Sequence, residues 1–265
     1  MRKSFPALVI AAAFAVLPLA QAAEHEEAAG QCRALDVAHW KAGTEIGNSA
    51  SLQRGARNFM GYCAGCHSLK YARYSRIAKD LGIPDEQFEK SLLPAGASKN
   101  DYVIAPLDAI DGNAWFGKAP PDLSLIARSR GTDYLYQFLK SFYADPATAS
   151  GVNNLSLPGT AMPHVLSALQ GVPEAVRCTL TENAGGEGGA VKGDSVVQKL
   201  EVPVAGQLSA AEYDEFVRDT VNFLDYVGEP AKLHRTSIGI WVILFLLVFT
   251  GFAYLLKQEY WKDVK

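Results

Sequence analysis

The sequence predicts a mostly α-helical domain that is exported from the cytoplasm and held to a membrane by one C-terminal helix. Three observations predict this architecture: an N-terminal apolar segment with signal-peptide features, hydrophobic residues at helical intervals in the middle of the chain, and a long uncharged segment near the C-terminus. The predicted boundaries are residues 1–22 for the signal peptide, 23–232 for the exported domain, 233–256 for the membrane anchor and 257–265 for a cytoplasmic tail.

Residues 1–22 have the three parts of a secretory signal peptide. Arg2 and Lys3 form a short basic region, an apolar run follows, and Ala20-Gln21-Ala22 matches the small-x-small pattern at which signal peptidase cleaves. An uncleaved membrane helix is the alternative, but the run is short and Pro18 interrupts it near its end. We therefore expect cleavage after Ala22 and a mature domain outside the cytoplasm.

The segment from Ile238 to Leu256 contains 19 residues without a charged side chain. At 1.5 Å per residue it forms a helix of about 28 Å, close to the thickness of the hydrocarbon core of a bilayer. A buried helix of a soluble protein is the alternative, but such a helix is rarely apolar on every side. We expect a single pass through the inner membrane with the domain on the periplasmic side. The basic residues among 257–265 suit a cytoplasmic tail, although Lys232 and Arg235 on the other flank weaken that asymmetry.

The region between the signal peptide and the anchor has about 210 residues, enough for one domain with its own core. It contains no internal repeat. Residues 83–121 are rich in Pro, Gly and Asp and are expected to be mostly loop, and the glycine-rich residues 183–194 are expected to form a surface loop. The predicted helices cover Ser51–Tyr62, Asp85–Leu92 and Thr132–Phe142, and a last helix begins at the capping box Ser209–Glu212 and ends near Gly228.

The exported part of the chain is acidic. It carries 20 basic and 26 acidic residues, a net charge of about −6. Such a balance disfavours nucleic acid as a partner. It suits electrostatic steering of a basic protein partner, and ordinary solubility explains it equally well.

Residues 63–67 read Cys63-Ala64-Gly65-Cys66-His67, the C-x-x-C-H motif of covalent c-type haem attachment. On a helical turn the two cysteines share a face, so each can capture one haem vinyl group, and the histidine that follows reaches the iron. The alternatives are a redox-active cysteine pair, half of a zinc site, or coincidence. A redox pair needs no such histidine, and a zinc site needs a second close Cys/His pair, which the sequence does not offer.

The second axial ligand of the iron follows by elimination. Met1 leaves with the signal peptide, and Met60 lies just before the motif, on the side of the histidine. Met162 remains, in a loop framed by Pro and Gly, and His164 is its rival. Ligation by His67 and Met162 raises the reduction potential and leaves no open coordination position, which indicates electron transfer.

Two further cysteines, Cys32 and Cys178, are left over once the motif is assigned. In an oxidising compartment they can pair with each other, and the sequence leaves two free thiols or a link to another chain equally open.

The assembled motifs resemble the cytochrome c1 family of the cytochrome bc1 complex, in its proteobacterial form. The resemblance covers the whole mature chain, and besides C-x-x-C-H it depends on one segment in particular. This segment is Ala119-Pro120-Pro121-Asp122-Leu123-Ser124, followed by Ala127-Arg128-Ser129-Arg130, and it is much more specific to this family than the haem motif is. Ala161-Met162-Pro163-His164 and the C-terminal anchor complete the pattern.

The resemblance implies a class I cytochrome c-like domain with long loop insertions, in which Cys63 and Cys66 carry one haem c and His67 and Met162 are its axial ligands. Pro120 and Pro121 would line the haem pocket. Arg130 would neutralise a haem propionate, with Arg128 as competitor, and a shorter connection than in mitochondrial relatives leaves Tyr134 in doubt as a second propionate partner.

The family role implied by the resemblance is electron transfer from the Rieske iron-sulfur protein to a soluble or tethered cytochrome c. Cytochrome b would contact the anchor helix, and the complex would be dimeric. The alternatives from the sequence are another membrane-tethered monohaem cytochrome c that supplies a terminal oxidase or reductase, and a haem enzyme or sensor with five-coordinate iron.

Overall fold

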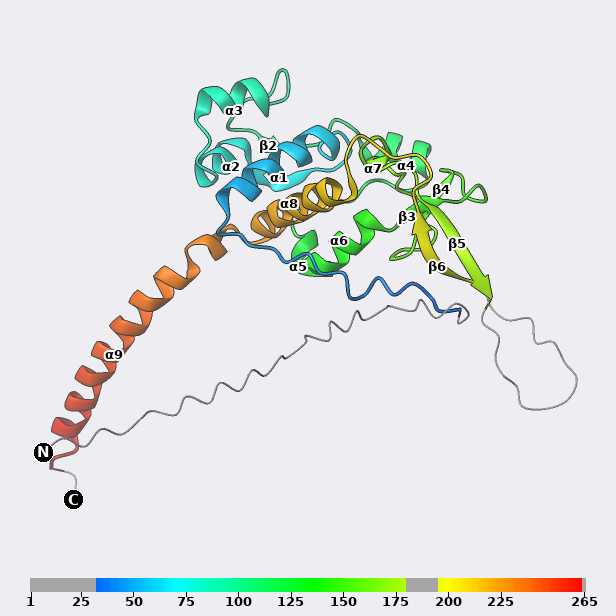
Figure 1. Cartoon of the computed structure of the whole chain (residues 1–265). Coiled ribbons are helices and arrows are strands. Elements are labelled where there is room, and N and C mark those ends of the chain that lie inside the picture. Colours follow the sequence, from blue (N-terminus) through cyan, green and yellow to red (C-terminus); the bar gives the residue numbers. More distant parts are fainter. Residues whose placement is uncertain (1–31, 180–194, 264–265) are drawn as a thin grey trace, which may run out of the picture. The chain divides into compact units, whose positions relative to one another are not determined.

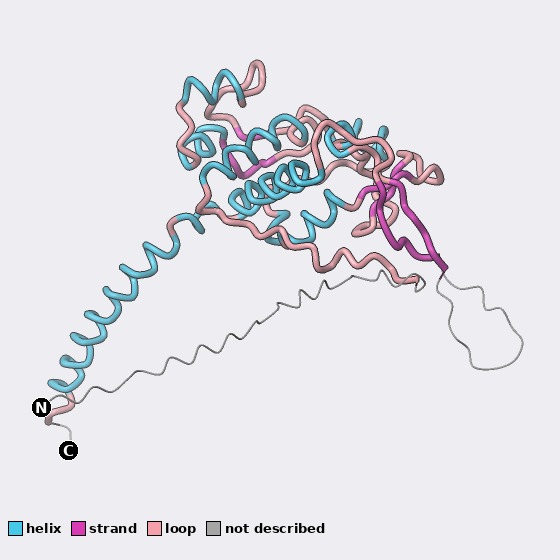
Figure 2. The backbone as a smooth tube through the Cα atoms, viewed as in Figure 1, coloured by secondary structure: helices cyan, strands magenta, loops and turns pink. Residues whose placement is uncertain are grey.

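The computed structural model describes residues 32–179 and 195–263, and the predicted signal peptide and the 183–194 loop lie outside this part. Most regular structure is helical, with three small two-stranded sheets among the described residues, which confirms the mostly α fold class (Figure 2). The helices are α1 Ser49–Tyr62, α2 Tyr74–Asp80, α3 Asp85–Ser91, α4 Ala109–Phe116, α5 Ile126–Arg130, α6 Thr132–Lys140, α7 Ser167–Gln170, α8 Ala210–Gly228, the 3₁₀ helix η1 Pro230–Leu233 and α9 Arg235–Tyr260. The strands are β1 Leu69–Arg73, β2 Tyr102–Val103, β3 Phe142–Ala144, β4 Val152–Asn154, β5 Glu174–Thr179 and β6 Ser195–Glu201.

Helices α1 and α8 lie side by side at the centre of the domain (Figure 1). The rings of Phe59 in α1 and Phe223 in α8 are both fully buried, with centroids 5.8 Å apart. The close approach depends on Gly55, because a Cβ at that position would lie 2.1 Å from the carbonyl oxygen of Asp219. The two helices therefore form the packed centre from which the haem motif extends.

The start of each central helix is fixed by a side chain, as capping rules require. Asn48 accepts a hydrogen bond from the backbone N–H of Ser51 at the start of α1. At the start of α8, Ser209 and Glu212 form the predicted capping box. The hydrophobic stripe of α8 is buried against α1 and also against α5 and α6. Both helices follow the sequence prediction closely.

Helix α6 is shorter than predicted. It ends at Lys140 rather than at residue 142, because Phe142 enters strand β3, where it pairs with Asn154 of β4. The side-chain amide of Asn154 donates to the carbonyl of Phe138, which also accepts from the backbone N–H of Ser141 at the end of the helix. A partner distant in sequence thus ends the helix.

Helix α4 lies within a segment that the sequence predicted to be mostly loop, so that prediction was wrong here. Asp108 caps its N-terminus by accepting from two backbone N–H groups, and Gly117 ends it with φ at 73°. Both are ordinary helix signals, hidden in a stretch where Asp and Gly are also frequent in turns. Helix α4 matters for the site because it borders the hollow beside the haem motif.

A disulfide joins Cys32 to Cys178, so the structure resolves the pairing that the sequence left open. Cys178 lies in β5, which pairs antiparallel with β6. The backbone N–H of Leu35 also donates to the carbonyl of Val197 in β6. The first described residues are thereby fastened to this hairpin.

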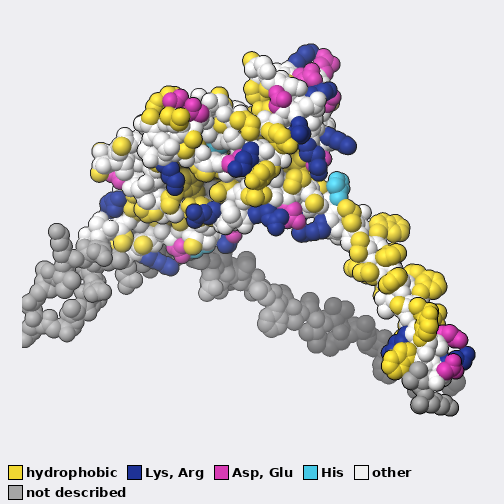
Figure 3. All heavy atoms as spheres, turned by 180° about the vertical axis from the view of Figure 1, so that it is seen from behind, with side chains coloured by type: hydrophobic (Ala, Val, Ile, Leu, Met, Phe, Trp, Pro, Cys, Tyr) yellow, Lys and Arg dark blue, Asp and Glu magenta, His cyan; other side chains and the backbone are white. Residues whose placement is uncertain are grey.

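Helix α9 is the one described helix long and apolar enough to cross a membrane. It covers Arg235–Tyr260, none of its residues is buried, and apolar side chains run along its length (Figure 3). An apolar helix with no protein covering it is the expected form of a membrane anchor. It begins and ends a few residues beyond the predicted uncharged segment.

Candidate haem-attachment site

The C-x-x-C-H motif forms the turn that directly follows α1. The backbone N–H of Cys63 donates to Phe59 at the end of the helix, and that of His67 donates to the carbonyl of Cys63 at 2.9 Å. Cys63 and Cys66 are both free thiols and both partly buried. Helix α1 thus holds the two thiols and the imidazole on one compact turn, as attachment of a single planar group requires.

The partly buried thiol of Cys63 is held in its neutral form. Burial, and to a smaller extent the neighbouring Cys66, raises its pKa to about 12. Redox-active cysteines instead have a lowered pKa, because the thiolate is the reactive form. The described residues also contain no group of three His, Cys, Asp or Glu side chains that could hold a metal ion. These observations oppose the redox and zinc alternatives.

His67 is held in one orientation by the segment that begins at Pro120. Its Nδ1 lies 2.8 Å from the carbonyl oxygen of Pro121, which fixes Nδ1 as the protonated nitrogen and leaves Nε2 free to bind a metal. Burial lowers the pKa of His67, opposed by this hydrogen bond and by the charge of Asp122. The imidazole is therefore neutral at physiological pH, as an axial ligand must be.

The segment after Pro121 is fastened to the chain that leaves the motif. The backbone N–H of Leu123 donates to the carbonyl of Ser68 at 2.9 Å, and that of Tyr71 donates to the hydroxyl of the buried Ser124. From the sequence alone, Leu123 and Ser124 indicated only a family resemblance. Their contacts show that the segment holds the carbonyl that orients His67.

A hollow of about 240 Å³ opens beside the attachment turn. The predicted site residues Cys66 and Pro120 both line it, together with residues from three neighbouring segments. The other lining residues are Ser68, Lys70, Ile104, Leu107, Asp108, Ala109 and Asp122.

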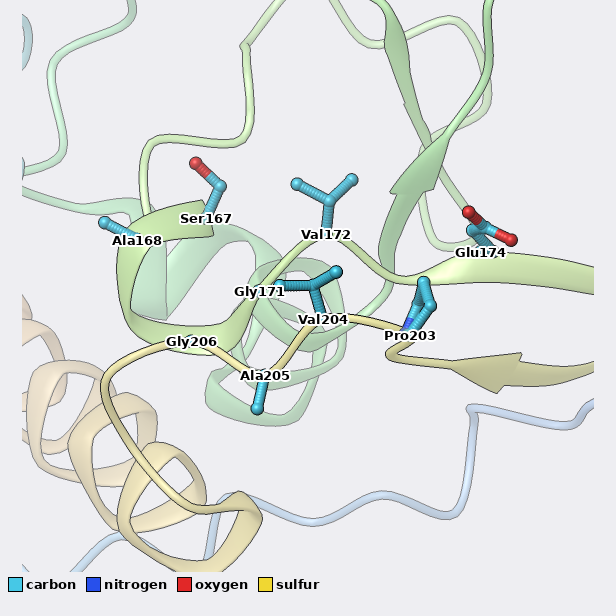
Figure 4. A pocket seen from close by; sticks show the side chains of 9 residues that line it. All are labelled: Ser167, Ala168, Gly171, Val172, Glu174, Pro203, Val204, Ala205 and Gly206. Atoms are coloured by element: carbon cyan, nitrogen blue, oxygen red, sulfur yellow. The ribbon is translucent and has the colours of Figure 1, made fainter.

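A larger hollow of about 430 Å³ lies between α7 and the segment before α8 (Figure 4). Val172 and Val204 line it, and none of the predicted site residues does. Its one carboxylate, on Glu174, has no ion pair among the described residues.

The two described methionines differ in their surroundings. Met60 packs against the main hydrophobic core, whereas Met162 is partly buried and is not among the described side chains that pack there. The backbone N–H of Met162 donates to the hydroxyl of Thr160 at 3.4 Å. Met162 is thus not required for the core. Met1 lies outside the described residues.

His164, the rival ligand, is buried and stacked on Phe142, with ring centroids 5.0 Å apart and planes 6° from parallel. Its Nε2 has no hydrogen-bond partner among the described residues. The His164 ring is therefore packed against Phe142, while its Nε2 remains available.

The two arginines of the candidate propionate site have different roles. Arg128 reaches Glu229 at 3.7 Å, and its stem packs against Gly228 at the end of α8. Arg130 has no carboxylate partner among the described residues, and its guanidinium lies 5.7 Å from the ring centre of Tyr134. The guanidinium of Arg130 and the ring of Tyr134 therefore lie close to each other.

The residues around the attachment turn fit a covalently bound haem. They supply two free thiols on one turn, an imidazole oriented by a carbonyl, and a hollow beside Cys66. Apolar residues are also exposed next to this hollow, where Ile104 is 58% and Ile110 is 79% exposed.

Comparison with known proteins gives a consistent result. The model of the Cytochrome C1 family matches residues 40–264. A cytochrome c1 of Allochromatium vinosum is 48% identical over 84% of this chain and 88% of its own. A protein of Nitrosomonas europaea named ammonia monooxygenase gamma subunit is 40% identical over 84% of this chain and 88% of its own. A cytochrome b/c1 protein of Bradyrhizobium diazoefficiens is 28% identical over 80% of this chain and 33% of its own. This chain therefore belongs to the cytochrome c1 family, whose members are the membrane-anchored electron-transfer subunit of the cytochrome bc1 complex and carry one covalently bound haem c.

Proposed function

We propose that this chain receives single electrons from the Rieske iron-sulfur protein and passes them to a cytochrome c, through a haem bound by Cys63 and Cys66. His67 and Met162 would hold its iron. The observation that carries the proposal is the orientation of His67, whose Nδ1 is bound by the Pro121 carbonyl so that Nε2 is free. Family membership supplies the electron-transfer role.

The chain's own residues have three tasks. When bound, the haem supplies the one-electron redox chemistry. The two thiols fix its position, and the His67 ring keeps one tautomer and one orientation. The Met162 thioether would complete the ligand set of the iron and so leave no position open to other ligands. We assign Pro120 and Pro121 to the wall of the haem pocket, since Pro120 lines the hollow beside Cys66.

We assign the propionate contact to Arg130. Its guanidinium has no carboxylate partner among the described residues, whereas that of Arg128 lies near Glu229. A partly buried propionate is costly unless a cation pairs with it, so the available arginine is the better candidate. The ring of Tyr134 beneath Arg130 supports this position.

The placement in the cell follows from both ends of the chain. We propose that residues 1–22 are a cleaved signal peptide, 23–232 a periplasmic domain, 233–256 the anchor in the inner membrane and 257–265 a cytoplasmic tail. The exposed apolar surface of α9 supports the anchor. Cytochrome b is the proposed neighbour of this helix, because the relative of Bradyrhizobium diazoefficiens is named cytochrome b/c1. That the complex is dimeric is implied by the family resemblance.

Replacing Met162 by Leu tests the ligand assignment. The variant should lose the weak far-red band of ferric sulfur ligation, bind carbon monoxide when reduced, and have a sharply lower midpoint potential, because the thioether favours ferrous iron. Met60→Leu is the matched control, since Met60 packs in the core, and it should keep the native potential. An unchanged potential in Met162→Leu, with a shift in His164→Phe, would assign the ligand to His164 instead.

Purification tests the partners. Chain extracted gently from membranes should bring with it cytochrome b and a Rieske protein, and its haem should be reduced by quinol at the rate of turnover. Copurification with an ammonia-oxidising enzyme, as the name of the Nitrosomonas europaea relative would suggest, would contradict the proposal.

A further inference from the structure

The carboxylate of Asp122 is held by two backbone groups on opposite sides. One oxygen accepts from the N–H of Lys70 at 2.9 Å, and the other accepts from the N–H of Ser124 at 3.0 Å. The first bond joins the segment after Pro121 to strand β1, and the second closes a tight turn within that segment. Asp122 is therefore a fixed point between the two stretches of chain that meet at His67.

Fixing Asp122 also fixes the carbonyl that orients the proximal histidine. Pro121 directly precedes Asp122, and its carbonyl oxygen lies 2.8 Å from Nδ1 of His67. A ligating histidine is tuned by the acceptor of its other ring N–H, because a stronger acceptor makes the ligand more basic. The position of Asp122 would thus influence the iron through the Pro121 carbonyl and the His67 imidazole.

Asp122 shares its hollow with one cationic residue, Lys70, and with a second acidic residue, Asp108. No ion pair involves Asp122 within residues 32–179 and 195–263, although Lys70 is adjacent. The ammonium of Lys70 instead lies 5.4 Å from the ring centre of Tyr71. The carboxylate lines the same hollow as Cys66.

We propose that Asp122 is a positioning residue that holds the reduction potential of the haem below the value it would otherwise have. The fixed carboxylate favours the more positive, ferric state by its charge, and it secures the Pro121 carbonyl that makes the His67 ligand more basic. This inference depends on the haem ligation proposed above.

The test is redox potentiometry of the haem in the purified complex, followed at its reduced α-band. Asp122→Asn removes the charge and keeps one acceptor oxygen, so the midpoint potential of the haem should rise. We expect the electron-transfer equilibrium constant to change at least threefold, which corresponds to about 28 mV at 59 mV per tenfold change. Asp122→Ser, whose hydroxyl can keep the turn to Ser124, should rise similarly. Asp122→Glu keeps the charge and should shift less than either.

Two controls separate charge from loosened structure. Ser124→Ala removes the hydrogen bond from Tyr71 in the same segment without changing charge, and Glu174→Gln removes an exposed charge that lines the other hollow. Both should shift the potential less than Asp122→Asn. The inference is overturned if the neutral Asp122 variants that bind haem keep the native potential, or if Ser124→Ala or Asp122→Glu shifts it equally. Absence of covalent haem from the wild-type chain would instead overturn the proposed function.

Discussion

The interface of α1 with α8 and the side of the domain around the attachment turn differ in how completely the protein covers itself. At the interface, aromatic rings are fully buried, and the buried carboxylate of Asp219 accepts hydrogen bonds from Ser51 and Arg54. At the attachment side, two thiols are free, and Ile104 and Ile110 are largely exposed. Helix α1 belongs to both regions, because it packs against α8 and its C-terminal end leads into the attachment turn. The comparison shows that side chains cover one another at the centre of the domain, whereas thiols and apolar side chains stay uncovered around the attachment turn.

The largest expected effect comes from Gly55 at the interface. Gly55→Val should lower the free energy of unfolding by about 3 kcal/mol or more, because a side chain there meets the backbone of Asp219 and the helices must separate. Thermal loss of native absorbance by the solubilised chain measures this. Gly61→Ala in the same helix is the control, since nothing lies within 4 Å of that position, and it should be neutral or stabilise by up to about 1 kcal/mol. Equal stability of the two variants would show that the helices are less closely packed than described.

The next effect concerns the buried carboxylate of Asp219. Asp219→Ala should cost about 2 kcal/mol, because it removes the acceptor of the Ser51 hydroxyl and the buried one of the two carboxylates that pair with Arg54. Glu215→Ala is the matched control: Glu215 also pairs with Arg54, but its side chain is 64% exposed, so the loss should be below about 1 kcal/mol. Denaturant unfolding of both variants makes the comparison, and equal losses would contradict the role of burial.

A smaller effect should appear at low pH. Burial alone would raise the pKa of Asp214, but hydrogen bonds from Lys140, Tyr136 and Arg218 outweigh it and lower the pKa to about 2 from 3.8. A carboxyl whose pKa is lower in the folded state stabilises that state above its unfolded pKa, and this contribution is lost as pH falls through the folded value. Asp214→Asn should therefore lose less stability than the wild type between pH 4 and pH 2. Parallel pH profiles of the unfolding free energy would contradict this.

The smallest effect is expected at the attachment side. Ile110→Ser should change the free energy of unfolding by less than about 0.5 kcal/mol, because the side chain is 79% exposed and packs against little. The same unfolding measurement applies. A loss comparable to that of Asp219→Ala would mean that this side belongs to the core, and the comparison between the two regions would fail.

The sequence predicted best those parts whose signals are local. The capping box at Ser209, the helix before Cys63 and the apolar segment of α9 each depend on neighbouring residues, and the structure has them. The end of α6, by contrast, depends on the pairing of Phe142 with Asn154, which no local pattern reveals. Helix α4 was missed because its capping residues are also turn residues.

The site was predictable to the same extent. The C-x-x-C-H motif identifies the attachment turn by itself, since spacing alone carries that signal. The role of Pro121 required the structure, because its carbonyl meets His67 across 54 residues of sequence. The hydrogen bonds of Asp122 likewise join segments that only folding brings together. The ligand Met162 stays a prediction from sequence.

The disulfide between Cys32 and Cys178 places a constraint on how the molecule is made. Four cysteines can pair in three ways, and the pair that forms spans 146 residues, with both thiols of the haem motif lying between its members. In an oxidising compartment, Cys32 would meet Cys63 and Cys66 before Cys178 has emerged. Thioether formation removes those two thiols from disulfide exchange for good. Haem attachment would then prevent wrong disulfides, because only Cys32 and Cys178 remain able to pair.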